Sequence, residues 1–178
     1  MSFTLHTIET APKASQSQLE GSLKDFGMIP NLHAVMAEAP KVLEAYKTLH
    51  QLFQASSFNN EELTVIWQTI NVEHNCHYCI PAHAGVAQMM NVDPAISTAI
   101  RNATVLENEK LQVLHETTLA LVRDRGLVSD EVVTNFYAQG YGKQQMLEII
   151  LGISQKVMSN YINHLSNTPV DKAFQAFI

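Results

Sequence analysis

The feature that most constrains the fold is a succession of helix-start and helix-stop signals, which leaves almost no segment with the pattern of a strand. Asp93-Pro94 pairs a helix-capping residue with a proline suited to the first helical turn. Arg125-Gly126 places a basic residue and then a glycine in the order expected where a helix ends. Signals of these kinds recur along the chain, so the sequence predicts an all-α protein built as a helical bundle.

The capping signals and the helical spacing of apolar residues divide the chain into predicted elements. Residues 1–13 are expected to form an irregular N-terminal arm, and residues 14–178 a single helical domain. Residues 167–178 are expected to dock on that domain, because Phe174, Phe177 and Ile178 are costly to leave in water. The predicted helices cover about residues 15–26, 32–38, 41–54, 60–73, 76–90, 94–103, 108–125, 129–140 and 143 onward. The apolar stripe predicted for the last helix comprises Met146, Ile149, Ile150, Ile153, Val157 and Tyr161.

The charge and the hydrophobic content of the chain limit its expected partners, location and assembly. The formal net charge is -6 and the basic residues form no run, which argues against nucleic acid or an anionic membrane surface as a partner. No apolar run approaches the roughly 20 residues that span a membrane, and no signal peptide is recognisable, so we expect a cytoplasmic protein. Because 46% of the 178 residues are hydrophobic and only 16% are charged, we expect a homo-oligomer that covers part of its apolar surface.

Both cysteines of the chain lie in one short stretch, VEHNCHYCIPAH, at residues 72–83. Pro81 is best tolerated in the first turn of a helix, so a helix should begin near residues 76–78. Cys76 and Cys79 are then three residues apart on one face, near free backbone N–H groups and the positive end of the helix dipole, which stabilise a thiolate. His83 lies one turn further on the side of Cys79 and can exchange a proton with it. Glu73 ends the preceding helix and could fold back to orient an imidazole or relay a proton.

Three interpretations of this stretch compete. A disulfide between Cys76 and Cys79 would close a very small ring that restrains little chain, so it is better suited to forming and breaking than to stabilising the fold. As a redox dithiol, the pair could reduce a peroxide through a sulfenic acid. A metal site could use both cysteines and His83 with His74 or His77, but no distant second pair of cysteines exists. The third interpretation is a pair of inert buried cysteines.

The same residues carry a resemblance to a known family. Glu73, Cys76, Cys79 and His83 resemble the signature of the alkylhydroperoxidase D-like branch of the carboxymuconolactone decarboxylase family. The segments GMIPNLHAVMAEAPKVLEAYKTL, RDRGLVSDEVVTNFYAQGYGKQQMLEIILGIS and NYINHLSNTPVD also resemble parts of that family, so the similarity covers roughly residues 20–172.

The resemblance implies an all-helical fold, symmetric oligomers and thiol-dependent peroxide reduction. It implies that peroxide attacks Cys79, that Cys76 resolves the product, and that His83 and a glutamate relay protons. In better-studied members the glutamate lies at the position of Thr64, with Glu62 nearby, so Glu73 is our assignment for this role. The expected substrates are a small hydroperoxide and an external dithiol reductant, either a lipoyl group or a thioredoxin-like protein. Two alternatives remain on the same fold: a decarboxylase-like lyase and a non-catalytic, zinc-binding helical oligomer.

Overall fold

The computed structural model describes residues 3–178, and within this range the chain forms nine α-helices, one 3-10 helix and no strand. The elements are α1 (Lys13–Phe26), α2 (Asn31–Met36), α3 (Pro40–Gln54), α4 (Asn60–Glu73), α5 (Cys79–Met89), α6 (Pro94–Arg101), α7 (Glu109–Arg123), α8 (Asp130–Ala138), α9 (Lys143–Ser166) and η1 (Lys172–Phe177). The all-α fold and the single domain predicted from the sequence are confirmed.

The helix ends form where the capping residues indicated. The Asn59 side chain accepts the backbone N–H of Glu62, and the Glu62 carboxylate accepts the backbone N–H of Asn59. This reciprocal pair satisfies two N–H groups that the first turn of α4 would otherwise leave unpaired. At the end of α1, Gly27 adopts the left-handed conformation, with a φ of 69°, that glycine reaches without steric cost.

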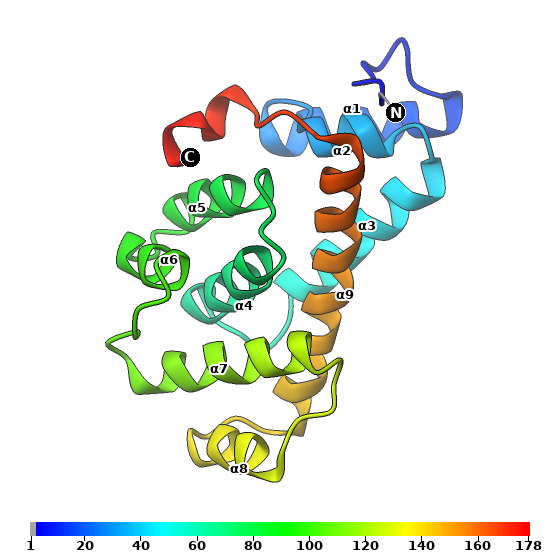
Figure 1. The fold of residues 1–178 in the computed structure, drawn as a ribbon. Helices are drawn as coiled ribbons and strands as arrows, with labels where there is room; N and C mark the ends of the chain where they lie inside the picture. Colours follow the sequence, from blue (N-terminus) through cyan, green and yellow to red (C-terminus); the bar gives the residue numbers. More distant parts are fainter. Residues whose placement is uncertain (1–2) are drawn as a thin grey trace.

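α4 lies at the centre of the bundle. It packs against α5, α6, α7 and α9, while α3 runs alongside α9 and α8 packs on α7 (Figure 1). The contact between α3 and α9 depends on Gly152, because a Cβ atom there would lie 2.8 Å from the ring of Phe53. A second packed layer, formed by α1, α2 and α3, holds its own apolar cluster, and Cys76 and Cys79 belong to that cluster. The cysteines therefore lie between the α4-centred core and the N-terminal helices.

The buried face of α9 differs from the predicted one. Ile149 is buried as expected, but Ile150 and Tyr161 are 40% and 59% exposed. The face that points inward is mainly polar and carries Gly152, Gln155, Lys156, Ser159, Asn160 and Asn163. The prediction is confirmed for Met146, Ile149 and Ile153, which belong to or pack against the α4-centred core. It is wrong for Ile150 and Tyr161, because it assumed that the whole apolar stripe of a helix faces the core. The exposed apolar residues of α9 are consistent with the expected homo-oligomer, which stays a prediction.

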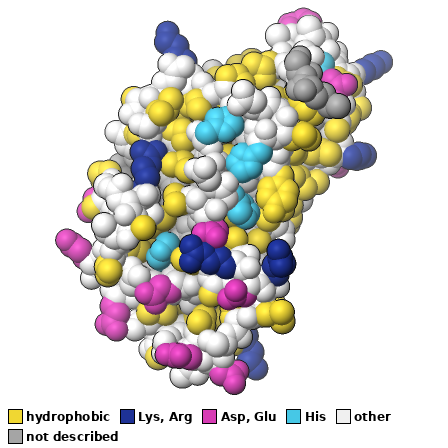
Figure 2. Space-filling model, in the orientation of Figure 1, with side chains coloured by type: hydrophobic (Ala, Val, Ile, Leu, Met, Phe, Trp, Pro, Cys, Tyr) yellow, Lys and Arg dark blue, Asp and Glu magenta, His cyan; other side chains and the backbone are white. Residues whose placement is uncertain are grey.

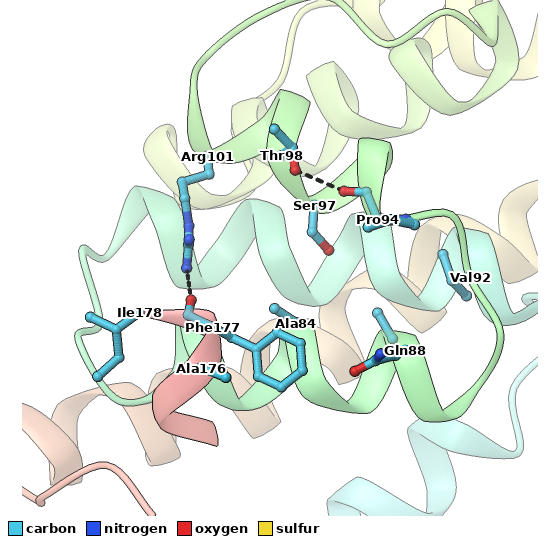
Figure 3. A pocket seen from close by; sticks show the side chains of 11 residues that line it. Ala84, Gln88, Val92, Pro94, Ser97, Thr98, Arg101, Ala176, Phe177 and Ile178 are labelled. Carbon is cyan, nitrogen blue, oxygen red and sulfur yellow. Dashed lines mark hydrogen bonds between the residues drawn. The ribbon is translucent and has the colours of Figure 1, made fainter. Parts of the chain in front are cut away.

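The C-terminal segment docks on α5, as predicted. Phe174 and Phe177 of η1 are half-buried and press on Gly85, where a Cβ atom would lie 2.7 Å from the Phe174 ring. Arg101 of α6 donates a hydrogen bond to the backbone carbonyl of Phe177 over 2.7 Å, and the Phe177 ring lies over α5 beside a cavity of about 390 Å³ (Figure 3). Ile178 differs from the expectation, since it is 77% exposed.

The helices and the surface charges bear on two expectations from the sequence, that the protein neither spans a membrane nor carries a basic patch. None of the helices in residues 3–178 is long and apolar enough to cross a membrane. Lysine and arginine side chains are scattered over the face shown in Figure 2, where they form no extended patch, and acidic side chains gather toward the end of the molecule that carries α7 and α8. This distribution agrees with the absence of a basic run in the sequence.

Candidate active site

The turn between α4 and α5 places both cysteines at the amino end of α5. Asn75 reverses the chain with a left-handed backbone, its φ being 50°, and the Cys76 N–H then bonds the carbonyl of Asn71. Cys79 is the first residue of α5, and its backbone N–H donates to Cys76 Sγ over 3.3 Å. Pro81 falls within the first turn, as predicted, but α5 begins at Cys79, so Cys76 lies in the preceding turn and not on a shared helical face. Both cysteines are reduced and buried.

The polar face of α9 lies against the sulfur atoms. Asn163 Nδ2 donates to Cys79 Sγ over 3.2 Å and lies 4.0 Å from Cys76 Sγ. Ser159 Oγ is also 4.0 Å from Cys79 Sγ. Cys79 thus has a donor from a second helix at close range, while the same donor is at the limit of contact with Cys76.

These surroundings make the two thiols unequal. Burial raises the pKa of Cys79, but the hydrogen bond from Cys76, the positive charge of Lys156 and the Asn163 amide outweigh burial and lower that pKa below its ordinary value. The pKa of Cys76 is raised, first by its hydrogen bond to Cys79 and then by burial. The lowered pKa of Cys79 favours the thiolate, the reactive form of a cysteine, at that position, and the raised pKa of Cys76 favours a proton there.

His83 is held in one neutral tautomer. Its Nε2 lies 2.8 Å from the Nζ of Lys156, and an ammonium can only donate, so Nε2 accepts. Burial, and then the positive charge of Lys156, lowers the pKa of His83 well below its ordinary value. The single ring proton is therefore on Nδ1, which is buried and has no hydrogen-bond partner in residues 3–178. His83 as a residue lines the same cavity as Cys79.

Hydrogen bonds and ring contacts among Trp67, Gln155 and His50 hold the side chains that pack beside His83. The Trp67 indole N–H donates to Gln155 Oε1 over 2.9 Å, which leaves the Gln155 amide nitrogen to donate to His50 Nδ1 over 3.2 Å. The Trp67 ring lies between His50 and His83, with ring centroids 5.6 and 4.9 Å away. Burial, followed by the charge of Lys156, lowers the pKa of His50 to about 4, so this imidazole is neutral as well.

Glu73 lies at the end of α4, but its carboxylate pairs with Arg123 of α7. Both oxygens accept from the guanidinium at 2.9 Å, and neither sulfur atom nor His83 bonds to it. Glu62 accepts from Tyr141 and from Lys110 at 3.0 Å each, so it also has other partners. The structure thus brings Cys76 and Cys79 together and places His83 on the wall of the same cavity as Cys79, while the relay roles of His83 and Glu73 stay predictions.

The histidines weighed as metal ligands bond elsewhere. His74 Nδ1 lies 2.9 Å from Asn160 Oδ1, and His77 Nε2 lies 2.9 Å from the carbonyl of Thr168. In the part of the chain that the structure describes, no group of three or more His, Cys, Asp or Glu residues is arranged to hold a metal ion.

The site opens into a cavity of about 580 Å³ between the N-terminal helices, α5 and η1. Cys79, His83 and Lys156 lie on its inner wall. Most of the remaining lining is apolar, including Phe26, Met28, Leu32, Val86, Met89 and Phe174. A cavity of this size and character suits a small organic molecule.

Two residues of the site escaped the reasoning from sequence: Lys156 and Asn163. A lysine in a helix is most often solvated, so nothing in its type marks Lys156 as buried. A signal did exist, because Gln155, Ser159 and Asn163 recur every four residues and so define one polar face of α9.

Solved structures with the same architecture exist. A peroxidase-related protein from Ralstonia eutropha JMP134, described as an alkylhydroperoxidase AhpD core, matches over 97% of this chain and 93% of its own, with 13% identity and a TM-score of 0.86. A peroxidase-related protein from Silicibacter sp. TM1040 matches over 96% and 93%, with 16% identity and a TM-score of 0.80. The debrominase Bmp8 C82A in complex with 2,3,4-tribromopyrrole matches over 99% and 95%, with 17% identity and a TM-score of 0.82.

No family sequence model matches the chain, and no curated protein matches it in sequence. Identities below 20% with almost complete coverage establish a common fold and leave the activity open. The chain has the fold of the alkylhydroperoxidase D-like proteins, as the resemblance of its cysteine stretch implied.

Proposed function

We propose that the protein is a thiol-dependent reductase that cycles Cys76 and Cys79 between dithiol and disulfide, with a hydroperoxide as the oxidant. The observation that carries this proposal is the unequal surroundings of the two sulfur atoms: Cys79 lines the cavity and accepts from the Asn163 amide at 3.2 Å, while Cys76 lies 4.0 Å from the same amide. The lowered pKa of Cys79 and the raised pKa of Cys76 agree with this division. A nucleophile and its resolving thiol need this division of roles. The two peroxidase-related structures with the same fold support the choice of reaction.

The reaction can be written with atoms and electrons balanced. The Cys79 thiolate attacks one oxygen of the hydroperoxide, the O–O bond breaks, and the departing alkoxide takes the proton from His83 Nδ1 as Nε2 accepts one from Lys156. Cys79 is then a sulfenic acid. Cys76 attacks this sulfur, its proton leaves with the hydroxyl as water, and the disulfide forms. An external dithiol, which we propose to be a lipoyl group or a thioredoxin-like protein, returns two electrons and two protons.

Treatment with one equivalent of cumene hydroperoxide tests the cycle. We expect the loss of both free thiols and a peptide that links Cys76 to Cys79 by mass spectrometry. Cys79→Ser should abolish peroxide consumption. Cys76→Ser should consume one equivalent and hold Cys79 as a sulfenic acid that dimedone traps. Retention of both thiols in the wild-type protein under excess peroxide would contradict the proposal.

A second candidate is reductive removal of a halogen from an aromatic ring. The structure of Bmp8 with tribromopyrrole favours it, together with the apolar cavity that leads to Cys79. In that reaction a carbon–bromine bond is replaced by carbon–hydrogen, bromide leaves, and the same dithiol is oxidised to the disulfide. Bromide release from a bromopyrrole, compared with consumption of cumene hydroperoxide by the same protein sample, decides between the two substrates.

A further inference from the structure

Lys156 is a cation inside the protein without a carboxylate partner. Its side chain is fully buried in α9, and none of the Asp or Glu residues within 3–178 lies within 4.0 Å of its Nζ. A buried ammonium without an anion is strongly disfavoured, so Lys156 can keep its charge only where the fold supplies a negative charge nearby.

The titratable groups that face Lys156 identify that charge. From α3 come His50, which is neutral, and the phenol of Tyr46, whose pKa burial raises. From α5 comes His83, also neutral, which accepts from Nζ at 2.8 Å. Cys76 keeps its proton. From α1 comes Asp25, which also lines the cavity but is exposed and lies more than 4.0 Å from Nζ. The Cys79 thiolate is therefore the one buried anion among these groups, and the ammonium and the thiolate together leave the buried site with no net charge.

Oxidation removes this anion. A sulfenic acid or a disulfide at Cys79 carries no charge, so the Lys156 ammonium would be left alone in the interior. The same step creates an alkoxide in the cavity that needs a proton. His83 connects the two, since Nε2 accepts from Lys156 and the proton on Nδ1 has no other partner in residues 3–178.

We propose that Lys156 is the proton store of the dithiol centre: its ammonium is the counter-ion of the Cys79 thiolate, and it releases its proton through His83 when Cys79 is oxidised. Nδ1 gives its proton to the departing oxygen as Nε2 takes one from Nζ, so the imidazole stays neutral. The products are the alcohol, the sulfenic acid and a neutral amine, and no proton is drawn from solvent. Reduction by the dithiol reverses the charges, returning the thiolate and the ammonium together.

This inference rests on the proposed dithiol cycle and deepens it, but its test does not need a peroxide. The protein with 13C-labelled lysine is reduced, then oxidised with diamide, which takes two electrons and two protons from a dithiol and leaves a disulfide. The NMR signal of the Lys156 ε-carbon should have the ammonium position in the reduced protein at pH 7 and move to the amine position after oxidation. Lys156→Arg assigns the signal by removing it.

A second measurement follows the thiolate. In a Cys76→Ser background, so that only Cys79 reacts, the rate of alkylation by iodoacetamide is recorded against pH. Adding Lys156→Met should raise the pKa of Cys79 and slow its alkylation at pH 6.5 roughly tenfold or more. Lys156→Arg, which keeps the charge, should restore most of the rate. Lys47→Met changes the other lysine of the cavity and should leave the pKa where it is.

Each result separates the two proposals. An ammonium signal that persists after oxidation, or a Cys79 pKa unchanged by Lys156→Met, would overturn the role of Lys156. If the signal and the pKa move as expected while no peroxide is consumed, the proton store stands and the peroxide is the wrong oxidant.

Discussion

At the scale of single residues, Asn163 is the group that distinguishes one sulfur atom from the other. Its amide lies 3.2 Å from Cys79 Sγ and 4.0 Å from Cys76 Sγ, so the closer sulfur receives the donated hydrogen bond. Such a bond is stronger to a thiolate than to a thiol, because one partner is charged. The difference favours the negative charge on Cys79, where the cavity can reach it.

Replacing Asn163 by alanine should weaken the thiolate. A hydrogen bond to a charged group contributes about 1.5–3 kcal/mol, and 1.36 kcal/mol corresponds to one pKa unit, so the pKa of Cys79 should rise by roughly 1 to 2. The pH dependence of alkylation measures this. Ser159→Ala is the matched control, because its hydroxyl lies 4.0 Å from Cys79 Sγ and should matter less. Equal effects from both variants would contradict the assignment.

Among the helices, the sequence predicted where each one lies along the chain better than which of its faces is buried. Pro81 located the start of α5, and with it the cysteines, because proline is restricted to the first turn. No comparable restriction exists for Lys156. Lys156 is buried against His83 of α5, which is distant in sequence and meets it only after α9 has packed. A prediction made for each helix separately therefore cannot identify the α9 residues that lie against the sulfur atoms.

The contact between α5 and η1 yields a prediction of its own. Gly85→Ala would place a Cβ atom 2.7 Å from the Phe174 ring, which lines the cavity at Cys79. The ring must shift, so the variant should be destabilised by about 1–3 kcal/mol despite the better helix propensity of alanine. Urea unfolding measures the loss.

Gly21→Ala is the matched control for that variant. Gly21 is also within a helix, but its Cβ would meet only the flexible end of Lys47, at 3.3 Å. This substitution should be neutral or stabilising by up to about 1 kcal/mol. A Gly85→Ala protein as stable as Gly21→Ala would show that η1 does not press on α5 in solution.

At the scale of the whole molecule, burial of uncharged imidazoles links stability to pH. Burial is the main cause that lowers the pKa of His33 to about 3 and that of His50 to about 4. An unfolded chain protonates both near pH 6.5. Between pH 6.5 and 4 the unfolded state therefore binds more protons than the folded state, and stability falls as the pH falls.

The expected loss for His50 alone is roughly 3 kcal/mol between pH 7 and pH 4, taking 1.36 kcal/mol per pKa unit. Urea unfolding at several pH values measures it. His50→Gln should flatten the dependence, while His164→Gln, at an exposed position, should not change it. A slope of the same size in His50→Gln would show that other groups cause the acid sensitivity.

In the proposed cycle, a reductant must reach two buried sulfur atoms through the cavity. Cys76 and Cys79 are 0% and 1% exposed, so a reductant whose own sulfur atoms lie flush with a broad protein surface cannot touch them while the helices stay packed. A dithiol at the tip of a slender, flexible arm can enter the cavity instead. We therefore expect the rate at which the disulfide is reduced to depend more on the cross-section of the reductant than on its reduction potential.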